Sequence, residues 1–343
     1  MTQKTPVAIL GATGAVGQKF VTLLADHPWF EVAALAASER SAGKAYGDAV
    51  RWLDPTPLPR HIADMPVLAC EPGIPGAIAF SALDASVAGP IETAFAAAGR
   101  AVVTNTRTHR LDADVPLLIP EINPDSLALI VGQRKQRRWK GFIVANPNCS
   151  TVVLAMALAP LHRAFGVERV FVATMQATSG AGYPGVPSLD ILGNVIPGIL
   201  GEEEKMERET QKILGASIVI SAHTNRVAVV DGHTESISVG LTKKATPEQA
   251  SEAIAAFRAP PDVEALPTAP CPPIVVHQAA DRPQPRLDVG LGRGMQISVG
   301  RVRACPILDI RLTALGHNTI RGAAGAAVLN AELLVSRGLV PAR

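Results

Sequence analysis

One thiol stands where a helix should begin. Cys149 lies in the segment ANPNCST (145–151), where Pro147 restricts the backbone and the neighbours are residue types that cap helix N-termini: Asn148, Ser150 and Thr151. The apolar periodic residues 152–165 then predict the helix itself. Because the positive end of a helix dipole favours an anion, we expect thiolate character at Cys149. A thiolate is the nucleophile of acyl and aldehyde chemistry. The alternative is a buried, inert cysteine.

Two polar side chains could assist this thiol. Arg226 and His233 bound the segment RVAVVDGH, which predicts an apolar strand, an Asp-Gly turn and a second strand over 236–241. The ends of a hairpin bring side chains from both strands to one edge. There an imidazole could accept and return protons near neutral pH, and a guanidinium could hold a carboxylate through two parallel bonds. A purely structural histidine is the alternative.

The N-terminal residues of the chain carry a pattern that is typical of nucleotide-binding domains. Residues 6–10 (PVAIL) predict a buried strand, a helical pattern runs over 16–25, and three glycines lie at the turn: Gly11, Gly14 and Gly17. Strand, glycine turn and helix in this order indicate a dinucleotide site whose phosphates lie on the helix N-terminus. The spacing GxxGxxG is a variant of the commoner GxGxxG. A purely structural glycine turn is the alternative.

The end of the next predicted strand, 31–37, indicates which dinucleotide binds. An NAD-preferring site places an acid there to hold the ribose 2′-hydroxyl. This chain has one acid, Glu39, among hydroxyls and cations that suit a 2′-phosphate: Ser38, Arg40, Ser41 and Lys44. We therefore favour NADP. The alternative is a solvated loop whose charges face water.

Alternating short strands and helices predict an α/β fold with a doubly wound, Rossmann-like parallel sheet. The further segments are strands at 78–83, 101–105 and 142–145 and a helix at 91–99. Arg107 and Arg110 follow the strand 101–105, at the carboxyl edge where such sheets bind ligands, and are candidates for anion binding. We interpret the basic run 134–140 as a solvated connection, because it has one aromatic residue and no repeat.

The second half predicts a substrate and dimerisation domain of α+β type with a mixed sheet. Its predicted strands are 167–176, 274–276, 296–303 and 307–313. The glycine-rich loop 177–185 could approach a cofactor, or could be a plain mobile loop. Most charges of the predicted helix 202–214 should face solvent, and residues 259–286 form a proline-rich extended arm. We expect Asn318 to cap a helix of small residues that folds back onto the N-terminal domain.

Composition limits the classes of function. The 343 residues suggest two domains, and 48% hydrophobic with 18% charged residues is typical of a soluble globular protein. A net charge of +2 gives no reason to expect nucleic acid or a membrane surface as a partner. No apolar run reaches the roughly 18 residues that span a bilayer. The cysteines are far apart (Cys70, Cys149, Cys271 and Cys305), which argues against a zinc site or disulfides and fits a reducing cytoplasm.

Taken together, these segments resemble aspartate-semialdehyde dehydrogenases of the form usual in archaea and fungi. The resemblance covers nearly the whole chain, through the motifs GATGAVGQ, SERSAGK, ANPNCST, MQATSGAGYPG, EEEKMERETQKIL, NRVAVVDGHTESISV, DRPQPRLD and HNTIRGAAGAAVLNAELL. So many motifs in one order are highly specific. One departure is Thr106-Arg107 after Asn105, where relatives commonly carry a small residue, and it bears on the shape of the phosphate pocket.

The resemblance implies roles for individual residues. Cys149 would be the nucleophile, His233 the general acid/base, Gln176 the group that orients the acyl carbon, and Arg226 the partner of the substrate α-carboxylate. Glu203 would meet the amino group, although the helix register leaves Glu202 or Glu204 possible. The remaining substrate residues would be Arg110 and Lys205, which hold phosphate, and Asn148. The implied NADP contacts are Gly11, Thr13, Gly14, Ala15, Val16, Gly17, Ser38, Arg40, Ser41, Ser179, Gly180 and Asn318, and no metal is implied.

The resemblance also implies the reaction. NADPH would reduce L-aspartyl 4-phosphate to L-aspartate 4-semialdehyde and phosphate through a Cys149 thioester, on the route to lysine, methionine and threonine. The alternatives are a CoA-thioester reductase of the malonyl-CoA type and, more distantly, a non-catalytic NADP sensor. The implied domains are 1–146 with 318–343 for NADP, and 147–317 for catalysis and for dimerisation. A homodimer or homotetramer is expected.

Overall fold

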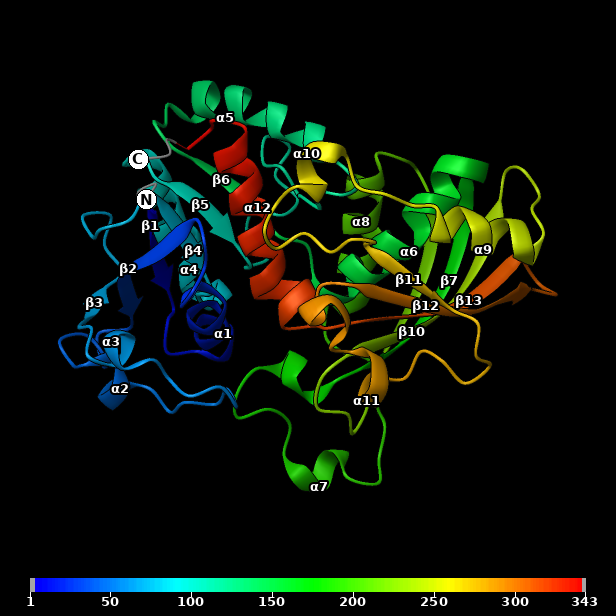
Figure 1. The fold of residues 1–343 in the computed structure, drawn as a ribbon, viewed down its shortest axis with the longest axis horizontal. Coiled ribbons are helices and arrows are strands. Elements are labelled where there is room, and N and C mark those ends of the chain that lie inside the picture. Colours follow the sequence, from blue (N-terminus) through cyan, green and yellow to red (C-terminus); the bar gives the residue numbers. More distant parts are fainter. Residues whose placement is uncertain (1–3, 341–343) are drawn as a thin grey trace.

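The computed structural model describes residues 4–340, in which two β-sheets carry helices on their faces (Figure 1). The first sheet has six parallel strands in the order β3-β2-β1-β4-β5-β6. These strands are β1 (Thr5–Leu10), β2 (Phe30–Ala37), β3 (Val67–Ala69), β4 (Ile78–Ser81), β5 (Ala101–Thr104) and β6 (Phe142–Ala145). The strand order reverses between β1 and β4, which is where doubly wound sheets bind their ligands. The predicted fold class is confirmed.

The strands of this sheet are apolar because both faces are covered. In β1, Val7 and Ile9 pack into one buried cluster, whereas Ala8 and Leu10 pack into the other. The helices of this part of the chain are α1 (Ala15–Leu24), α2 (Tyr46–Ala49), α3 (Arg60–Ala63), α4 (Ala85–Ala97) and α5 (Leu129–Arg137). A strand that is apolar on both sides is held in one register, and this fixes the carboxyl edge where the loops gather.

The second sheet has seven strands of mixed direction, in the order β11-β12-β13-β10-β7-β9-β8. They are β7 (Val167–Gln176), β8 (Ile196–Pro197), β9 (Val219–Arg226), β10 (His233–Leu241), β11 (Ile274–His277), β12 (Ile297–Ala304) and β13 (Ile310–Gly316). The helices α6 (Cys149–Phe165), α8 (Glu202–Leu214) and α9 (Pro247–Ala255) lie on one side of it (Figure 1). The short helices are α7 (Ser188–Ile191), α10 (Pro261–Glu264) and α11 (Pro285–Asp288). The predicted mixed sheet is confirmed.

The C-terminal segment returns to the first sheet, as predicted. A π-helical turn, η4 (Ile320–Ala324), leads into α12 (Gly325–Ser336), whose residues join α1 and the first sheet in one buried cluster. Arg321 donates from Nη1 to Glu121 Oε1 (2.6 Å) and from Nη2 to Glu121 Oε2 (3.0 Å), with both side chains buried. Asn318 is not the helix cap that we expected. Its amide instead bonds to Gly232 and Ser179 in the neighbouring loops.

The predicted hairpin between Arg226 and His233 is wrong. β9 ends at Arg226, the next strand does not begin until His233, and residues 227–232 form a loop. β9 and β10 do not pair with each other, because β7 lies between them, parallel to β9 and antiparallel to β10. The apolar run 227–230 has the composition of a strand, but it forms part of this loop. Arg226 and His233 still lie at the same edge of the sheet, because the end of β9 and the start of β10 both align with the end of β7.

Three other predictions also need correction. α4 begins at Ala85 and not at 91, because Asp84 accepts a hydrogen bond from the Ser86 backbone N–H and caps it. Much of the basic run 134–140 belongs to α5, where the Arg137 guanidinium bonds to Asp112 and Asp114. β13 begins at 310 and not at 307.

The charges of α8 also differ from the prediction. Only Glu204 and Arg208 among its charged side chains are exposed, whereas Glu202 and Glu209 are buried. The helix therefore turns part of its charged surface towards the protein. Within residues 4–340, none of the helices combines the length and the hydrophobicity that crossing a membrane requires.

Candidate active site

Cys149 is the first residue of α6, as the sequence predicts. The Asn148 side-chain oxygen accepts hydrogen bonds from the backbone N–H groups of Ser150 (2.9 Å) and Thr151 (3.2 Å) and so caps the helix. The strand β6 ends just before this cap, so the thiol lies at the carboxyl edge of the first sheet. Cys149 is half-buried. The thiol thus stands on a rigid helix start that a substrate can still reach.

The structure brings His233 to this thiol. Its Nε2 lies 3.2 Å from Cys149 Sγ, and its Nδ1 accepts a hydrogen bond from the Ala177 backbone N–H at 3.1 Å. Since Nδ1 is an acceptor, the ring proton of the neutral imidazole belongs on Nε2, which faces the sulfur. His233 is fully buried at the start of β10. It is therefore positioned to donate a hydrogen bond to sulfur.

Burial controls the charge of both groups. Burial, and next the negative charge of Glu202, raises the pKa of Cys149 to about 12, although Arg110 and Arg226 act against this. Burial, and next the positive Arg226, lowers the pKa of His233 to about 3. Thiol and imidazole are therefore both neutral near pH 7. The raised pKa of Cys149 acts against the thiolate character expected from the helix start, because burial disfavours the charged form of the thiol.

Three strand ends place the other groups around the thiol. Arg226 ends β9 directly beside Gln176, which ends β7, and His233 begins β10 on the other side of β7. The Arg226 Nη1 donates to the Ala177 carbonyl oxygen at 2.7 Å. A Cβ atom on Gly180 would lie 2.8 Å from Arg226 Nη1 and 3.0 Å from His233 Cε1, so this loop packs flat on both side chains. Only glycine permits that approach.

A second cation is tied to the start of α6. Arg110 donates from Nη1 to Glu209 Oε1 (3.1 Å) and from Nη2 to the Asn105 carbonyl oxygen (2.7 Å). The other Glu209 oxygen accepts from the Asn148 backbone N–H at 2.6 Å. Lys212, one turn of α8 further on, donates to the carbonyl oxygens of Arg110, Asp112 and Val115. These contacts hold the Arg110 loop against the residue that precedes the thiol.

The structure places Glu202, and not Glu203, beside this group. Glu202 Oε1 accepts from the Asn148 side-chain amide, and Oε2 accepts from Lys205 Nζ at 2.7 Å. Glu203 faces β9, where its carboxylate accepts from the Thr224 backbone N–H at 2.9 Å. Successive side chains of a helix point about 100° apart, so only one of the two can reach Asn148. Glu202 therefore joins Lys205 to Asn148, whereas Glu203 lies outside this group.

The glycine turn has the geometry that a dinucleotide requires. Gly11 has φ +79°, and a Cβ atom on it would lie 2.5 Å from the Ala82 carbonyl oxygen. A Cβ atom on Gly17 would lie 2.2 Å from the Gly11 carbonyl oxygen. Gly14 is the N-cap of α1, so the backbone N–H groups of the following turn, which includes Ala15, are available to phosphate. These residues fit a pyrophosphate.

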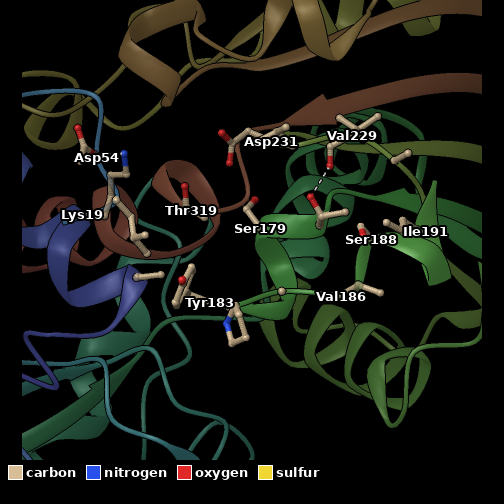
Figure 2. Close-up of a pocket in the computed structure, with 18 of the residues that line it drawn as sticks. Lys19, Asp54, Ser179, Tyr183, Val186, Ser188, Ile191, Val229, Asp231 and Thr319 are labelled. Atoms are coloured by element: carbon tan, nitrogen blue, oxygen red, sulfur yellow. Dashed lines mark hydrogen bonds and ion pairs between the residues drawn. The ribbon is translucent and has the colours of Figure 1, made fainter. Parts of the chain in front are cut away.

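The other predicted cofactor residues approach this turn from two directions. The exposed Ser38 and Arg40 and the half-buried Ser41 follow β2, which is the neighbour of β1 in the sheet. Asn318 Nδ2 donates to Ser179 Oγ at 2.7 Å. A cleft of about 550 Å³ lies between α1 and the loop that begins at Thr178, and Figure 2 shows Lys19 on one side, Ser179 on the other and Thr319 between them. Of the predicted cofactor residues, Ala15 and Ser179 line this cleft.

Comparisons with known proteins agree with this geometry. Residues 6–130 match the family described as Semialdehyde dehydrogenase, NAD binding domain, and residues 158–321 match Semialdehyde dehydrogenase, dimerisation domain. The aspartate-semialdehyde dehydrogenase of Archaeoglobus fulgidus is 48% identical over 97% of this chain and 99% of its own length, and that of Cryptococcus neoformans is 47% identical over 97% and 98%. The chain belongs to the aspartate-semialdehyde dehydrogenase family.

Solved structures of the family share the whole fold. The aspartate semialdehyde dehydrogenase of Candida albicans, crystallised with NADP, superposes with a TM-score of 0.91 at 40% identity and covers 98% of this chain and 100% of its own. Aspartate semialdehyde dehydrogenase II of Vibrio cholerae superposes with a TM-score of 0.79 at 31% identity, covering 97% and 98%. Both domains of this chain are therefore arranged as in the family.

Sequence reasoning missed several residues of this family member's site. Glu209 bonds to both Arg110 and Asn148, and a Cβ atom on Gly322 in η4 would lie 2.6 Å from the Cys149 Cβ. A signal for Glu209 was present, because the buried face of α8 recurs at helical spacing as Glu202, Met206, Glu209 and Ile213. A carboxylate that shares a buried stripe with Met206 and Ile213 indicates a buried partner. The role of Gly322 depends on tertiary packing and left no local signal.

Among residues 4–340, no group of three or more histidine, cysteine, aspartate or glutamate side chains is arranged to hold an ion. The four cysteines are free thiols.

Proposed function

We propose that this chain reduces L-aspartyl 4-phosphate to L-aspartate 4-semialdehyde and phosphate with NADPH, in the biosynthesis of lysine, methionine and threonine. The observation that carries the proposal is the 3.2 Å contact between Cys149 Sγ and His233 Nε2 at an edge that also holds Arg226 and Gln176. Thiol, imidazole, amide and guanidinium together serve one acyl transfer. Membership of the aspartate-semialdehyde dehydrogenase family supports the choice of substrate.

We assign the substrate contacts from charge and position. Arg226 would take the α-carboxylate, because a buried guanidinium offers two parallel donors. Glu202 would meet the ammonium group in place of Glu203, since it lies beside Asn148 and the start of α6. Arg110 and Lys205 would hold the phosphate. Each is held by a carboxylate in this structure, Arg110 by Glu209 and Lys205 by Glu202, so their positions are fixed before substrate binds.

The protein's own groups carry the acyl transfer. Cys149 Sγ attacks the acyl carbon, the C–O bond to phosphate breaks, the thiol proton leaves with the phosphate, and a thioester remains on the enzyme. The Nε2–H of His233 faces the sulfur and stabilises it both as nucleophile and later as leaving group. The Asn148 side chain already accepts from the Ser150 and Thr151 N–H groups, so the Cys149 backbone N–H would be the donor to the developing oxyanion at the start of α6. NADPH, when bound, supplies the hydride that reduces the thioester.

The residues around the cleft fit NADP. The glycine turn Gly11–Gly17, with Thr13, Ala15 and Val16, would hold the pyrophosphate, and Ser38, Arg40 and Ser41 would hold the 2′-phosphate. Ser179, Gly180 and Asn318 lie at the other end of the cleft, beside His233 and Arg226. A solved relative contains NADP, which supports this choice. Gly180, which follows Ser179 of the cleft lining, packs on His233 and Arg226 beside the thiol.

We also propose a homodimer formed through the second sheet, with a tetramer left to experiment. Alternate side chains of β7 and β9 are exposed on the face opposite α6, and these include Phe171 (44%) and Val219 (71%). The family description of residues 158–321 as a dimerisation domain supports this assembly.

We assign residues 1–146 with 318–343 to the NADP domain and residues 147–317 to the catalytic domain. We also propose a cytoplasmic location, because free thiols are typical of a reducing compartment.

The test is a two-substrate assay. Wild-type protein should reduce NADP when given aspartate semialdehyde and phosphate together, and Cys149→Ala should abolish this. NADPH oxidation with malonyl-CoA runs in parallel. Activity with the CoA ester alone would refute the proposed substrate. Mass spectrometry of the protein trapped with substrate should locate an acyl adduct on Cys149, and an adduct elsewhere would refute the mechanism.

A further inference from the structure

A carboxyl group lies buried without a partner next to the active site. Glu235 follows His233 by two residues in β10, so the two side chains share the face that α6 covers. Glu235 is 0% exposed, and neither of its carboxyl oxygens has a hydrogen-bond partner among the described residues. A buried polar group without a partner costs free energy. Its presence beside the nucleophile therefore calls for a functional explanation.

The charge state of Glu235 limits what it can do. Burial raises the pKa of Glu235 well above its ordinary value. An unpaired carboxylate in this position would cost far more than a neutral acid, so the group is protonated near pH 7. A carboxylic acid has one O–H donor and a carbonyl acceptor. Glu235 is therefore a hydrogen-bonding group and not a base.

The sheet register identifies the group that Glu235 can reach. Glu235 lies directly opposite Thr174 of β7, and side chains in such pairs have Cβ atoms about 4.5–5.5 Å apart. Thr174 is also fully buried, and its hydroxyl oxygen accepts a hydrogen bond from Gln176 Nε2 at 3.3 Å. Since Gln176 is two residues further along β7, all three side chains lie on one face. They form a polar row from the interior to the active site.

We propose that Glu235 is a positioning residue for Gln176 and acts through the Thr174 hydroxyl. The Thr174 oxygen already accepts from Gln176, so its own proton is free to reach the Glu235 carbonyl through one buried water, since the two side chains make no direct hydrogen bond. This bridge would fix the hydroxyl, and the hydroxyl fixes the Gln176 amide. The inference rests on the proposed function, in which Gln176 orients the acyl group. Glu235 itself touches no substrate.

The experiment compares four variants with wild type in the NADP-reduction assay. Glu235→Leu keeps the volume and removes both polar atoms, and kcat should fall about tenfold while the KM for NADP changes less than about twofold. Glu235→Gln keeps a donor and an acceptor and should retain most of kcat. Thr174→Val should resemble Glu235→Leu. The double variant Thr174→Val/Glu235→Leu should lose no more than either single one, because both remove the same connection.

Each outcome decides the proposal. Wild-type kcat in Glu235→Leu would overturn it, and so would equal losses in Glu235→Gln and Glu235→Leu, which would mean that an ionisable carboxyl is needed. Additive losses in the double variant would show that Glu235 does not act through Thr174. If Glu235→Leu does not fold, Thr174→Val decides alone, and unchanged kcat there overturns the proposal. Failure of the proposed function would appear separately, as inactive wild-type protein.

Discussion

Gly322 is the position at which a single methyl group should damage catalysis most directly. This residue lies in η4, and an added Cβ would lie 2.6 Å from the Cβ and 2.9 Å from the Cα of Cys149. Ordinary contact begins at 3.4 Å, so Gly322→Ala must separate the two backbones by about 0.8 Å to restore it. η4 is held by the buried Arg321–Glu121 pair, and Cys149 is held by the Asn148 cap. Neither side can move freely.

The magnitude follows from the Cys149–His233 contact. A shift of about 1 Å at a reacting atom costs about 10²-fold in rate, so kcat of Gly322→Ala should fall about 100-fold. Overpacking should also lower the free energy of unfolding by about 1–3 kcal/mol. We would measure kcat by NADPH absorbance, the alkylation rate of Cys149 with iodoacetamide, and unfolding in urea.

Gly132→Ala is the matched control. Gly132 lies inside α5, and a Cβ atom there has no neighbour within 4 Å. This variant should keep wild-type kcat and gain up to about 1 kcal/mol of stability, because alanine favours helix over glycine. Wild-type kcat and alkylation in Gly322→Ala, or equal loss of kcat in Gly132→Ala, would refute the packing argument.

Three further predictions concern charges at the site. Arg226→Lys should lower kcat/KM for aspartate semialdehyde at least about tenfold, because an ammonium group cannot replace the two parallel donors of the guanidinium group. The NADP Kd measured by calorimetry should stay unchanged. Equal losses in kcat/KM and in NADP affinity would contradict the assigned role. The alkylation rate of Cys149 in the free protein should still rise about tenfold per pH unit above pH 9, because the pKa of Cys149 is raised and only the thiolate reacts. Glu202→Gln should speed the alkylation, because it removes a negative charge beside the thiol. A plateau of the rate near pH 8 would disprove the raised pKa. Glu209→Gln should raise the KM for phosphate about tenfold, because Arg110 loses its ionic partner, and an unchanged KM would exclude Arg110 from the phosphate site.

Most of the scaffold could be predicted from the sequence because its signals are local. The strand β7 was predicted with the bounds that the structure has, and α8 likewise. The helix start at Cys149 was predictable because a cap depends on the residues within one turn, and the Asn148 side chain does form it. The glycine turn followed from a spacing in which each glycine has a separate steric reason. Local chemistry was sufficient for these elements.

Predictions failed where distant segments compete. The run after Arg226 has the composition of a strand, but β7 already occupies the position between β9 and β10, so the run becomes a loop. Asn318 is a good cap by type, yet its amide bonds to Gly232 and Ser179, and this leaves it unavailable to the helix. The choice between Glu202 and Glu203 depends on how α8 is rotated against α6. No single segment contains that information.

By itself the sequence determined the order of the elements, the place of the thiol at a helix start, the dinucleotide turn and the family resemblance, because each is written in residues that are close together in the chain. Tertiary structure alone decided that His233 lies 3.2 Å from Cys149, that Glu209 joins Arg110 to Asn148, and that Gly322 packs on the nucleophile. It also decided that the pKa of the Cys149 thiol is raised, because desolvation depends on every element that packs around the sulfur and not only on the helix that carries it.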